Sequence, residues 1–415
     1  MGMRAEKIRQ TFTWRQALPG KPLKSVELFA GAGGLALGVS RAGFRHLAVV
    51  ERDRDACETV RANQGRRVPH LVDWPLREGD VAQFDYSEFG EDIDLLSGGP
   101  PCQPFSLGGK HRGKEDARNM FPEVVRAVQH LKPKAILVEN VRGLVRQSFM
   151  AYFEYIILQL SHPTVTRLQD EDWLDHLSRL EQHHTSGKST DLSYNVVFRV
   201  VNAANYGVPQ RRERVLIVGF RSDLGMDWSF PNPTHSRDAL LHDQYVTGEY
   251  WERHEVPLKQ RQQAPERFKE RIREISPANR KFLPAAWRTV RDAIGDLPSP
   301  STFDGDQSKS ISNHLFQPGA RPYPGHTGSP LDEPAKTLKA GDHGVPGGEN
   351  MLTLPDGNVR YFSVRESARL QTFPDEIIFP GSWTESMRQL GNAVPVSLGE
   401  KMAMEIHYNL ARSAG

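Results

Sequence analysis

Residues 26–42 read Val-Glu-Leu-Phe-Ala-Gly-Ala-Gly-Gly-Leu-Ala-Leu-Gly-Val-Ser-Arg-Ala, and this stretch decides the fold class. A short apolar run at 26–30 enters a turn rich in glycine, and a helical pattern follows at 35–42. A strand that turns directly into a helix is half of a β-α-β unit, from which mostly parallel sheets are built. The glycines let the backbone turn tightly and approach a ligand at the start of the helix.

The same alternation of strand and helix continues along the chain. Short apolar runs that predict further strands lie at 47–50, 93–97, 135–138, 195–201 and 214–220. Helical patterns lie between them at 120–131 and 150–160. This order predicts an α/β fold with a mostly parallel, Rossmann-like sheet. Such sheets bind their ligands at the carboxyl ends of the strands.

The character of the chain changes after residue 221, where Pro, Gly and His become frequent and the periodicity weakens. We therefore place a domain boundary near Pro231. The expected parts are an N-terminal arm (1–22), a large domain (23–230) with an insert of unassigned role (161–193), a smaller irregular domain (231–350), and a return to the large domain (351–415). Apolar periodicity at 396–410 predicts that the chain closes with an amphipathic helix.

Composition excludes several classes of protein. The chain is 38% hydrophobic and 25% charged, as is usual for a globular protein, and no apolar run approaches the roughly 18 residues of a membrane-spanning helix. The N-terminus lacks the apolar core of a secretion signal. A single disulfide between the two cysteines, Cys57 and Cys102, is not expected in such a chain. We expect a cytoplasmic protein.

The net charge of +2 does not identify a partner, but one segment is strongly basic. Residues 253–291 contain eleven Lys or Arg and four Glu, a local net charge of +7. Such a segment could follow a phosphate backbone. A solvated helix surface with internal ion pairs explains it equally well.

The glycine turn, Phe29 to Gly34, has acidic partners. Glu51 ends the second predicted strand, where a carboxylate can accept hydrogen bonds from a ribose. Asp80 follows a third strand and could accept from an adenine amino group. Glycines that serve only packing remain an alternative. A nicotinamide dehydrogenase fits less well, because the last two glycines are adjacent and the diphosphate fingerprint is not met. S-adenosylmethionine, which has no diphosphate, suits the turn better.

Cys102 lies in Gly-Gly-Pro-Pro-Cys-Gln-Pro-Phe-Ser at 98–106, directly after a predicted strand. Glycines allow a tight turn and prolines fix the backbone, so the thiol is presented rigidly at the edge of the sheet. A thiol of ordinary pKa, about 8.5, needs help from its surroundings to act as a nucleophile. The stretch 107–118 that follows is basic and rich in glycine, which suits a loop closing over nucleic acid or a plain solvated loop.

Two further groups are expected near Cys102. Glu139 ends the strand at 135–138 on the same rim, where it could act as an acid, cap a helix or form an ion pair. Arg212 and Arg214 lie in Gln-Arg-Arg-Glu-Arg at 210–214. Alternation along a strand would point both arginines to one face, where they suit an anion or a base carbonyl.

In this order the motifs resemble those of the DNA (cytosine-5)-methyltransferases of bacterial restriction-modification systems. The matching stretches cover nearly the whole chain outside 1–22, 161–193 and the middle of the smaller domain. They are 29–34, Glu51, Asp80, 100–106, 139–141, 210–214, 365–375 and 389–394. No single motif decides the matter, but the ordered set is specific.

The resemblance implies a chemistry for this chain. A cytosine is flipped out of duplex DNA, Cys102 adds to its C6, Glu139 protonates N3, and Arg214, with Arg212 beside it, holds the base carbonyl. S-adenosyl-L-methionine donates the methyl group and leaves as S-adenosyl-L-homocysteine. The cofactor residues implied are Phe29, Ala30, Gly31, Gly33, Gly34, Leu35, Glu51, Arg52, Asp80, Val81, Pro100, Asn392 and Ala393.

By the same resemblance, the smaller domain (231–350) recognises the target sequence. The DNA-binding residues implied are Gln103, Ser106, Lys110, Arg112, Lys336, Thr337 and Lys339. We expect a monomer on double-stranded DNA in a bacterial cytoplasm, associated with the nucleoid, away from membranes. A cognate restriction endonuclease would share its DNA site without needing to bind it. The chain departs from the pattern at Arg52, where relatives often have a tryptophan.

Two alternatives remain. A transfer-RNA cytosine-5 methyltransferase could share the scaffold, but such relatives usually have Thr in place of Ser106 and a Cys-Phe-Thr signature, and the smaller domain has no cysteine. A non-catalytic DNA-binding homologue should have lost Cys102, Glu139 or the cofactor glycines, and all are present.

Overall fold

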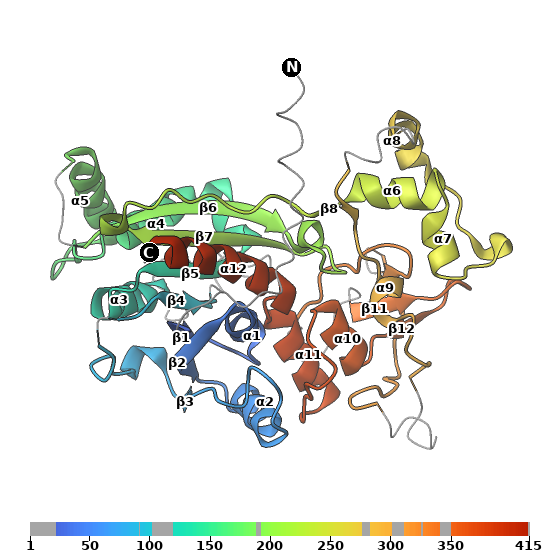
Figure 1. Ribbon diagram of the computed structural model, residues 1–415, viewed down its shortest axis with the longest axis horizontal. Coiled ribbons are helices and arrows are strands. Elements are labelled where there is room, and N and C mark those ends of the chain that lie inside the picture. The colour runs from blue at the N-terminus through green and yellow to red at the C-terminus, as the bar shows by residue number, and fades with distance from the viewer. Residues whose placement is uncertain are drawn as a thin grey trace.

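A computed structural model of the protein describes residues 22–90, 92–101, 119–187, 192–275, 283–300, 311–324, 327–340 and 350–413. Its central element is a seven-stranded sheet in the order β3-β2-β1-β4-β5-β7-β6 (Figure 1). The strands are β1 (Leu23–Leu28), β2 (Phe44–Glu51), β3 (Leu76–Glu78), β4 (Leu95–Gly98), β5 (Ala135–Val141), β6 (Tyr194–Asn202) and β7 (Glu213–Arg221).

The strand directions explain where a ligand can bind. The pairs β1-β2, β2-β3, β1-β4 and β4-β5 are parallel, whereas β7 runs antiparallel to both β5 and β6. The carboxyl ends of the parallel strands therefore meet at one edge, and the antiparallel β7 brings its first residues to the same edge. The mostly parallel α/β fold predicted from the sequence is confirmed.

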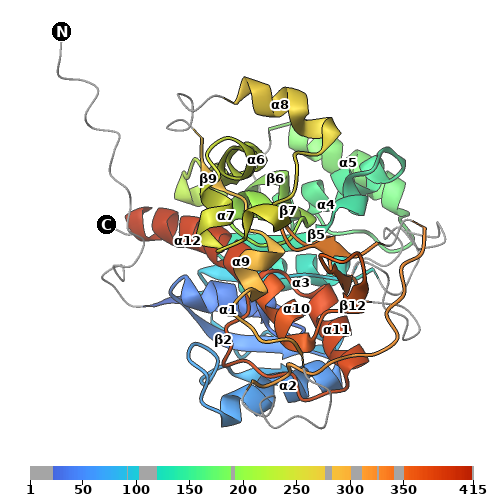
Figure 2. The ribbon, with the colours of Figure 1, turned by 90° about the vertical axis from the view of Figure 1, so that its right-hand side faces the viewer.

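Helices cover both faces of this sheet (Figures 1 and 2). On one face α3 (Phe121–Leu131) and α4 (Met150–Ser161) share a core with Leu28 and Val138. On the other face α1 (Gly34–Arg41) and the closing helix α12 (Val396–Ser413) share a core with Leu137. The amphipathic helix predicted at 396–410 is thus confirmed. Among the described residues, no helix combines the length and apolar character needed to cross a bilayer.

The first strand ends earlier than the sequence pattern suggests. The apolar run was expected to form a strand over 26–30, but β1 ends at Leu28. Phe29 and Gly31 have φ values of 56° and 55°, in the left-handed region. This backbone conformation cannot continue a strand, so the glycine turn begins one residue after Leu28.

The predicted insert, 161–193, contains a helix that the sequence analysis did not predict. Helix α5 (Trp173–Thr185) begins at Asp172, whose side chain accepts hydrogen bonds from two backbone N–H groups in the first turn. It packs against α4, where the Tyr155 hydroxyl lies 2.8 Å from Nδ1 of His176. The polar composition of the segment hid the short apolar face of this helix.

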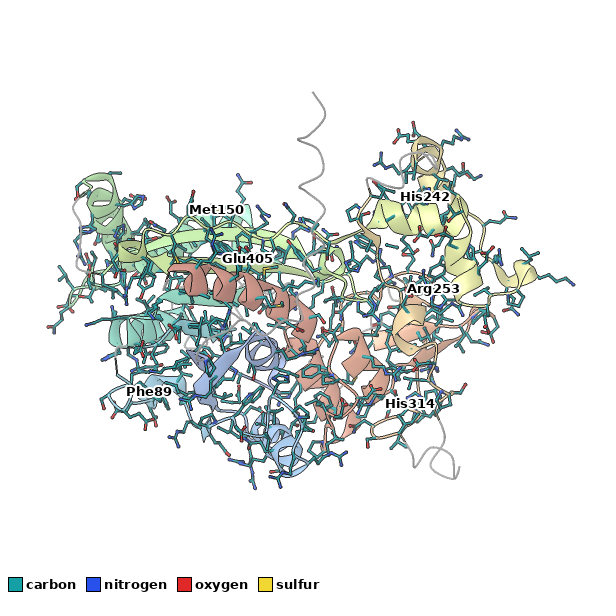
Figure 3. The ribbon with its side chains drawn as sticks, in the orientation of Figure 1. Phe89, Met150, His242, Arg253, His314 and Glu405 are labelled. Atoms are coloured by element: carbon teal, nitrogen blue, oxygen red, sulfur yellow. The ribbon has the colours of Figure 1, made fainter. Side chains whose placement is uncertain are left out.

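The chain after residue 221 forms a second lobe beside the sheet (Figures 1 and 2). Its elements are β8 (His235–Ser236), α6 (Arg237–Tyr245), α7 (Glu249–Arg253), α8 (Lys269–Glu274), β9 (Ala285–Ala286) and α9 (Val290–Ile294). A separate small core holds them together, formed by Ala204, Leu240, Tyr250, Trp251, Val256 and Trp287. His242 and Arg253 mark this lobe in Figure 3.

A small sheet crosses the boundary expected at residue 350. It joins β10 (Ser329–Pro330) to β11 (Met351–Thr353) and β12 (Val359–Tyr361). The chain therefore leaves the second lobe after β12, through α10 (Val364–Leu370) and α11 (Trp383–Asn392), which lie between the lobe and the large sheet (Figure 1).

Candidate active site

A cavity of about 1670 Å³ opens at the carboxyl edge of the sheet, between the sheet, the second lobe and α11. Most of the described site residues predicted from the sequence line it. They are Phe29, Ala30, Gly31, Leu35, Glu51, Arg52, Asp80, Val81, Pro100, Glu139, Arg214, Thr337, Lys339, Asn392 and Ala393. Cys102, Gln103, Ser106, Lys110 and Arg112 lie outside the described residues.

The glycine turn is organised by Glu51 at the end of β2. Its Oε2 accepts a hydrogen bond from the Gly31 N–H at 2.6 Å, and its Oε1 accepts from the N–H groups of Arg52 (2.8 Å) and Asp53 (2.6 Å). The carboxylate therefore fixes the turn after β1 against the turn after β2. Both turns border the cavity.

Gly33 and Gly34 serve close packing and do not line the cavity. A Cβ on Gly33 would lie 2.7 Å from the Trp74 ring, and Gly33 has a left-handed φ of 90° at the N-cap of α1. A Cβ on Gly34 would lie 2.3 Å from the carbonyl oxygen of Val394. Gly33 thus lets the turn pack on Trp74, and Gly34 lets α1 pack on the backbone at Val394, next to Asn392 and Ala393.

Asp80 follows β3, as predicted, and caps a short helix through a hydrogen bond from the Ala82 N–H to its Oδ1 (3.0 Å). Its Oδ2 lies 3.5 Å from Nη1 of Arg52. Arg52, which replaces the tryptophan often seen in relatives, thus reaches across the cavity edge to the acid expected at the adenine.

Glu27 is a cavity residue that the sequence analysis missed. It is the second-last residue of β1, is 1% exposed, and accepts a hydrogen bond from the Ser97 hydroxyl through Oε2. Its Oε1 is buried without a hydrogen bond among the described residues. Burial raises the pKa of Glu27 to about 8, although the Ser97 hydrogen bond opposes this shift. A charged residue inside an apolar strand was the signal that could have revealed it.

Glu139 and Arg214 face each other across the strand pair β5-β7. Nε of Arg214 lies 2.7 Å from Oε1 of Glu139, and both side chains are largely buried. Within the described part of the chain, this ion pair with Arg214 is the polar contact of the buried Oε1 of Glu139. Burial lowers the pKa of Arg214, and the carboxylate of Glu139 opposes that shift.

The neighbouring asparagine holds the loop that leads to Cys102. Nδ2 of Asn140 donates a hydrogen bond to the carbonyl oxygen of Pro100 at 2.9 Å. Pro100 and Pro101 line the cavity, and a Cβ on Gly99 would lie 3.4 Å from Oε2 of Glu139. The residues before Cys102 are therefore fixed beside Glu139.

Arg212 does not share a face with Arg214, so that expectation is wrong. It lies before β7, where strand alternation does not apply, and it is fully buried outside the cavity lining. Its guanidinium donates hydrogen bonds to the carbonyl oxygens of Leu338 (3.1 Å), Gly391 (2.7 Å) and Ala393 (2.9 Å). Burial holds the pKa of Arg212 well below its usual range. Arg212 therefore connects its own segment to Leu338 and to residues 391–393, and it does not line the cavity.

Of the three second-lobe residues expected to bind DNA, two line the cavity and one does not. Thr337 and Lys339 line the cavity, and the Thr337 hydroxyl donates to the carbonyl oxygen of Arg211 at 2.7 Å. Lys336 is outside the lining, with its Nζ 3.1 Å from the Thr327 hydroxyl.

Acidic side chains neutralise part of the basic segment 253–291. The ion pairs are Arg253–Asp292 (3.2 Å), Arg267–Glu333 (3.5 Å), Lys269–Glu266 (2.6 Å), Arg271–Glu274 (2.6 Å), Arg271–Asp238 (2.5 Å) and Arg291–Asp332 (2.6 Å). The solvated, ion-paired surface considered from the sequence therefore describes much of this segment.

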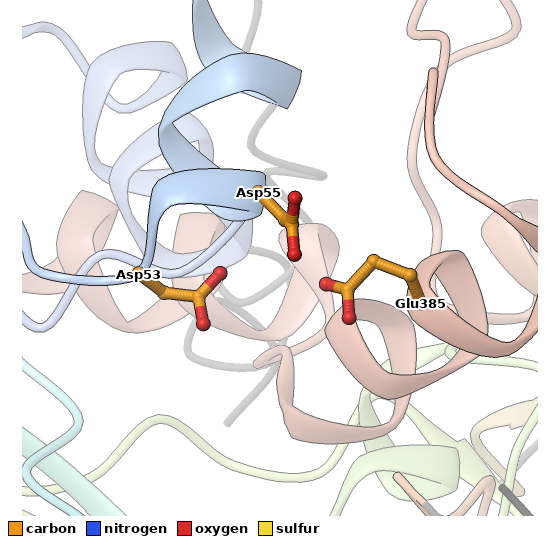
Figure 4. A group of neighbouring side chains, drawn as sticks. All are labelled: Asp53, Asp55 and Glu385. Atoms are coloured by element: carbon orange, nitrogen blue, oxygen red, sulfur yellow. The ribbon is translucent and has the colours of Figure 1, made fainter.

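Asp53, Asp55 and Glu385 bring three carboxylates together where α2 (Arg54–Gly65) meets α11 (Figure 4). Arg388 lies 2.8 Å from Asp53 and 2.7 Å from Glu385. Asp53 also caps α2 by accepting from the Ala56 N–H. These contacts join α2 to α11 beside the cavity, and we assign no metal to the group.

The fold and this cavity are those of a class of protein: α/β enzymes with a cavity at the carboxyl edge of the sheet, where such folds bind their ligands. Residues 23–162 and 175–408 match the family of C-5 cytosine-specific DNA methylases. The chain belongs to this family and is a DNA (cytosine-5)-methyltransferase. The residues between the two matched stretches, 163–174, fall within the predicted insert.

Named relatives agree with this assignment. The chain is 34% identical to the Type II methyltransferase M.Eco47II of Escherichia coli over 381 residues, which cover 90% of this chain and 76% of that protein. It is 33% identical to the Type II methyltransferase M.PspPI of a Psychrobacter strain over 395 residues, which cover 93% of this chain and 80% of that protein.

The fold also matches a solved structure, that of a putative DNA modification methyltransferase encoded within a prophage of E. coli. The TM-score is 0.55 at 21% identity, and the match covers 94% of this chain and 99% of that one. This likeness supports the fold.

Proposed function

We propose that the protein transfers a methyl group from S-adenosyl-L-methionine to C5 of a cytosine in double-stranded DNA, with Cys102 as the nucleophile. The observation that carries the proposal is the buried pair Glu139–Arg214, 2.7 Å apart, beside the two prolines that lead to Cys102. An acid and a cation held together in one cavity suit the ring nitrogen and the carbonyl of a cytosine.

The cavity fits the cofactor at its β1-β2 end. Glu51 and Asp80 offer acceptors for a ribose and an adenine, and Phe29 and Gly31 place backbone and an aromatic ring beside them. Oε1 of Glu27, buried without a hydrogen bond among the described residues, would accept from a positively charged ligand group once the carboxyl group has lost its proton. When bound, S-adenosyl-L-methionine would supply a methyl group attached to a positively charged sulfur.

The residues of the chain would act on the base in successive steps. A flipped cytosine enters the cavity, because its ring atoms cannot be reached inside the duplex. The Cys102 thiolate forms a bond to C6 while Glu139 delivers a proton to N3 and Arg214 binds the carbonyl oxygen, which makes C5 electron-rich. After C5 is methylated, it loses its proton, and the bond between Cys102 and C6 breaks to release 5-methylcytosine.

We propose that the second lobe, within 231–350, recognises the DNA sequence. Thr337 and Lys339 support this because they line the cavity from that side. Lys336 would reach DNA outside it, and Gln103, Ser106, Lys110 and Arg112 would do so from the cysteine loop. The single chain carries every motif, which favours a monomer on the duplex. Type II relatives favour a role in restriction-modification.

The test combines the protein with isotope-labelled S-adenosyl-L-methionine and unmethylated genomic DNA, followed by bisulfite sequencing. We expect labelled 5-methylcytosine at one recurring sequence, on both strands if that sequence is a palindrome. Label at N4 of cytosine, label transferred to RNA and not to DNA, or no transfer at all would contradict the proposal.

A further inference from the structure

Three arginines gather around one carboxylate at the lobe side of the cavity. Nη1 of Arg211 lies 3.6 Å from Oε2 of Glu333, and Nη2 of Arg267 lies 3.5 Å from Oε1 of the same carboxylate. Arg237 lies near enough for its charge to be repelled by Arg211 and Arg267 and attracted by Glu333, and like Arg211 it is close to the cavity. We name Arg211, Arg237, Arg267 and Glu333 the arginine cluster. The cluster contains three guanidinium groups and one carboxylate, which contacts Arg211 and Arg267, so the cluster carries an excess of positive charge.

Arg237 is the member whose charge is least compensated. The acid next to it in sequence, Asp238, is bound by Arg271 at 2.5 Å. Among the described residues, the contacts of the Arg237 guanidinium are with aromatic rings: its Cζ lies 4.8 Å from the ring centroid of Trp287 and 5.6 Å from that of Phe268. Burial lowers the pKa of Arg237, the charges of Arg211 and Arg267 lower it further, and the carboxylates of Glu333 and Asp238 oppose this shift.

The aromatic contacts hold Arg237 in place before any ligand binds. Nε1 of Trp287 donates a hydrogen bond to Oδ1 of Asn205 at 2.9 Å, which fixes the ring that Arg237 contacts. A guanidinium restrained on an aromatic ring keeps its N–H groups free at the edge and loses little entropy on binding. Such an arrangement suits the bidentate recognition of a phosphate.

Arg211 and Arg237 reach the cavity from different parts of the chain. Arg211 precedes β7, three residues before Arg214, and Arg237 is the first residue of α6 in the second lobe. Both line the cavity that contains Glu139 and Arg214. An anion between them would reduce their mutual repulsion and lie within the same cavity as the base that reacts.

We propose that Arg237, with Arg211, binds a backbone phosphate of the DNA next to the flipped cytosine. This inference rests on the proposed function, because it requires duplex DNA in the cavity. A phosphate held from both lobes would position the flipped nucleotide relative to Glu139 without reading the base sequence. It also explains why the Arg237 guanidinium lies against aromatic rings and forms no ion pair within the described part of the chain.

The first test measures the affinity for a duplex that contains the methylated sequence, over a range of salt concentrations. For Arg237→Gln we expect binding to weaken about tenfold at ~0.1 M salt, and the slope of log K against log salt to fall by about one. Arg237→Lys keeps the charge and should keep most of the slope. Arg271→Gln is the matched control, because Asp238 and Glu274 already neutralise that exposed arginine, and its slope should not change.

The second test locates the contact. Single uncharged methylphosphonates replace each phosphate of the duplex in turn. At one position beside the target cytosine, the replacement should weaken DNA binding by the wild-type protein. The same replacement should not further weaken DNA binding by the Arg237→Gln variant. Cofactor affinity and melting temperature must match the wild type. An unchanged slope, or equal losses in both proteins at every position, would overturn the phosphate site. A wild-type protein that neither methylates nor binds DNA would reject the proposed function instead.

Discussion

Glu27 makes the stability of the ligand-free protein depend on pH. Burial raises the pKa of its carboxyl group to about 8 in the folded state, from the ordinary glutamate value of 4.5, so the group keeps its proton up to about pH 8. Between these values the folded state holds the extra proton, so the free energy of unfolding falls as pH rises, by up to about 1.4 kcal/mol per pH unit. This loss is complete only above the folded-state pKa.

Glu27→Gln should remove this dependence. The amide retains a hydrogen-bonding group but cannot ionise, so the variant should be close to the wild type near pH 5 and more stable near pH 8. Urea unfolding at the two pH values measures both free energies. If wild type and variant lost stability in parallel over this range, the carboxyl group would not be the cause.

Cys102→Ala should abolish methyl transfer while cofactor binding persists. Loss of a covalent nucleophile typically costs a factor of roughly a thousand or more in rate. Initial rates with labelled cofactor measure the loss, and calorimetry measures the affinity for S-adenosyl-L-methionine. The matched control is Cys57→Ala, since Cys57 is buried in α2 and should be dispensable for transfer. Full activity of Cys102→Ala would exclude the proposed mechanism.

At the scale of elements, α11 and the segment 335–340 lie so close together that there is no room for a side chain at Gly391. A Cβ on Gly391 would lie 2.2 Å from the Ala340 nitrogen and 2.4 Å from the Lys339 carbonyl carbon. Both are backbone atoms, which cannot move aside as a flexible side chain does. Arg212 bonds to carbonyl oxygens of both segments at this place.

Gly391→Ala should therefore destabilise the protein by about 1–3 kcal/mol, as overpacked cores do. Gly65→Ala is the control, because a Cβ there meets nothing within 4 Å at the end of α2. Thermal unfolding should show a lower midpoint for the first variant and little change for the second. If both variants had the same unfolding midpoint, the segment 335–340 would be able to move away from the added methyl group at no cost in free energy.

The elements that the sequence predicted well are those with local signals. The strand and glycine turn at Phe29, the acid at Glu51 and the acid at Glu139 each follow an apolar run, so the parallel sheet places them at one edge. The orientation of Arg212 could not be predicted, because its partners at Leu338, Gly391 and Ala393 are more than a hundred residues away. Helix α5 was missed for a local reason, since its apolar face is short and the segment around it is polar.

At the scale of the whole molecule, charge is unevenly distributed although the net charge is only +2. The arginine cluster and Lys339 line or border the cavity on the lobe side, while much of the basic segment 253–291 is ion-paired. DNA would therefore be attracted to the cavity and less to α8.

Affinity for duplex DNA should fall steeply with salt, because each phosphate neutralised releases condensed counterions. The slope of log K against log salt should be about −0.9 for each phosphate bound. Replacing Arg291, which is paired with Asp332 at 2.6 Å, should lower the stability of the second lobe more than it changes the slope. Affinity that did not vary with salt would contradict a DNA site in this cavity.

The hydrogen bonds between 210–212 and 335–338 also bear on recombination between relatives. The backbone N–H of Arg211 donates to the Ala335 carbonyl oxygen at 2.8 Å, and the Gln210 side chain accepts from the Leu338 N–H at 3.0 Å. A recognition lobe transplanted from a relative would have to bring residues that fit these partners, whatever DNA sequence it reads. In a working hybrid enzyme, the transplanted segment should therefore end before residue 335. The native segment from Ala335 onward then stays with the large domain that it contacts.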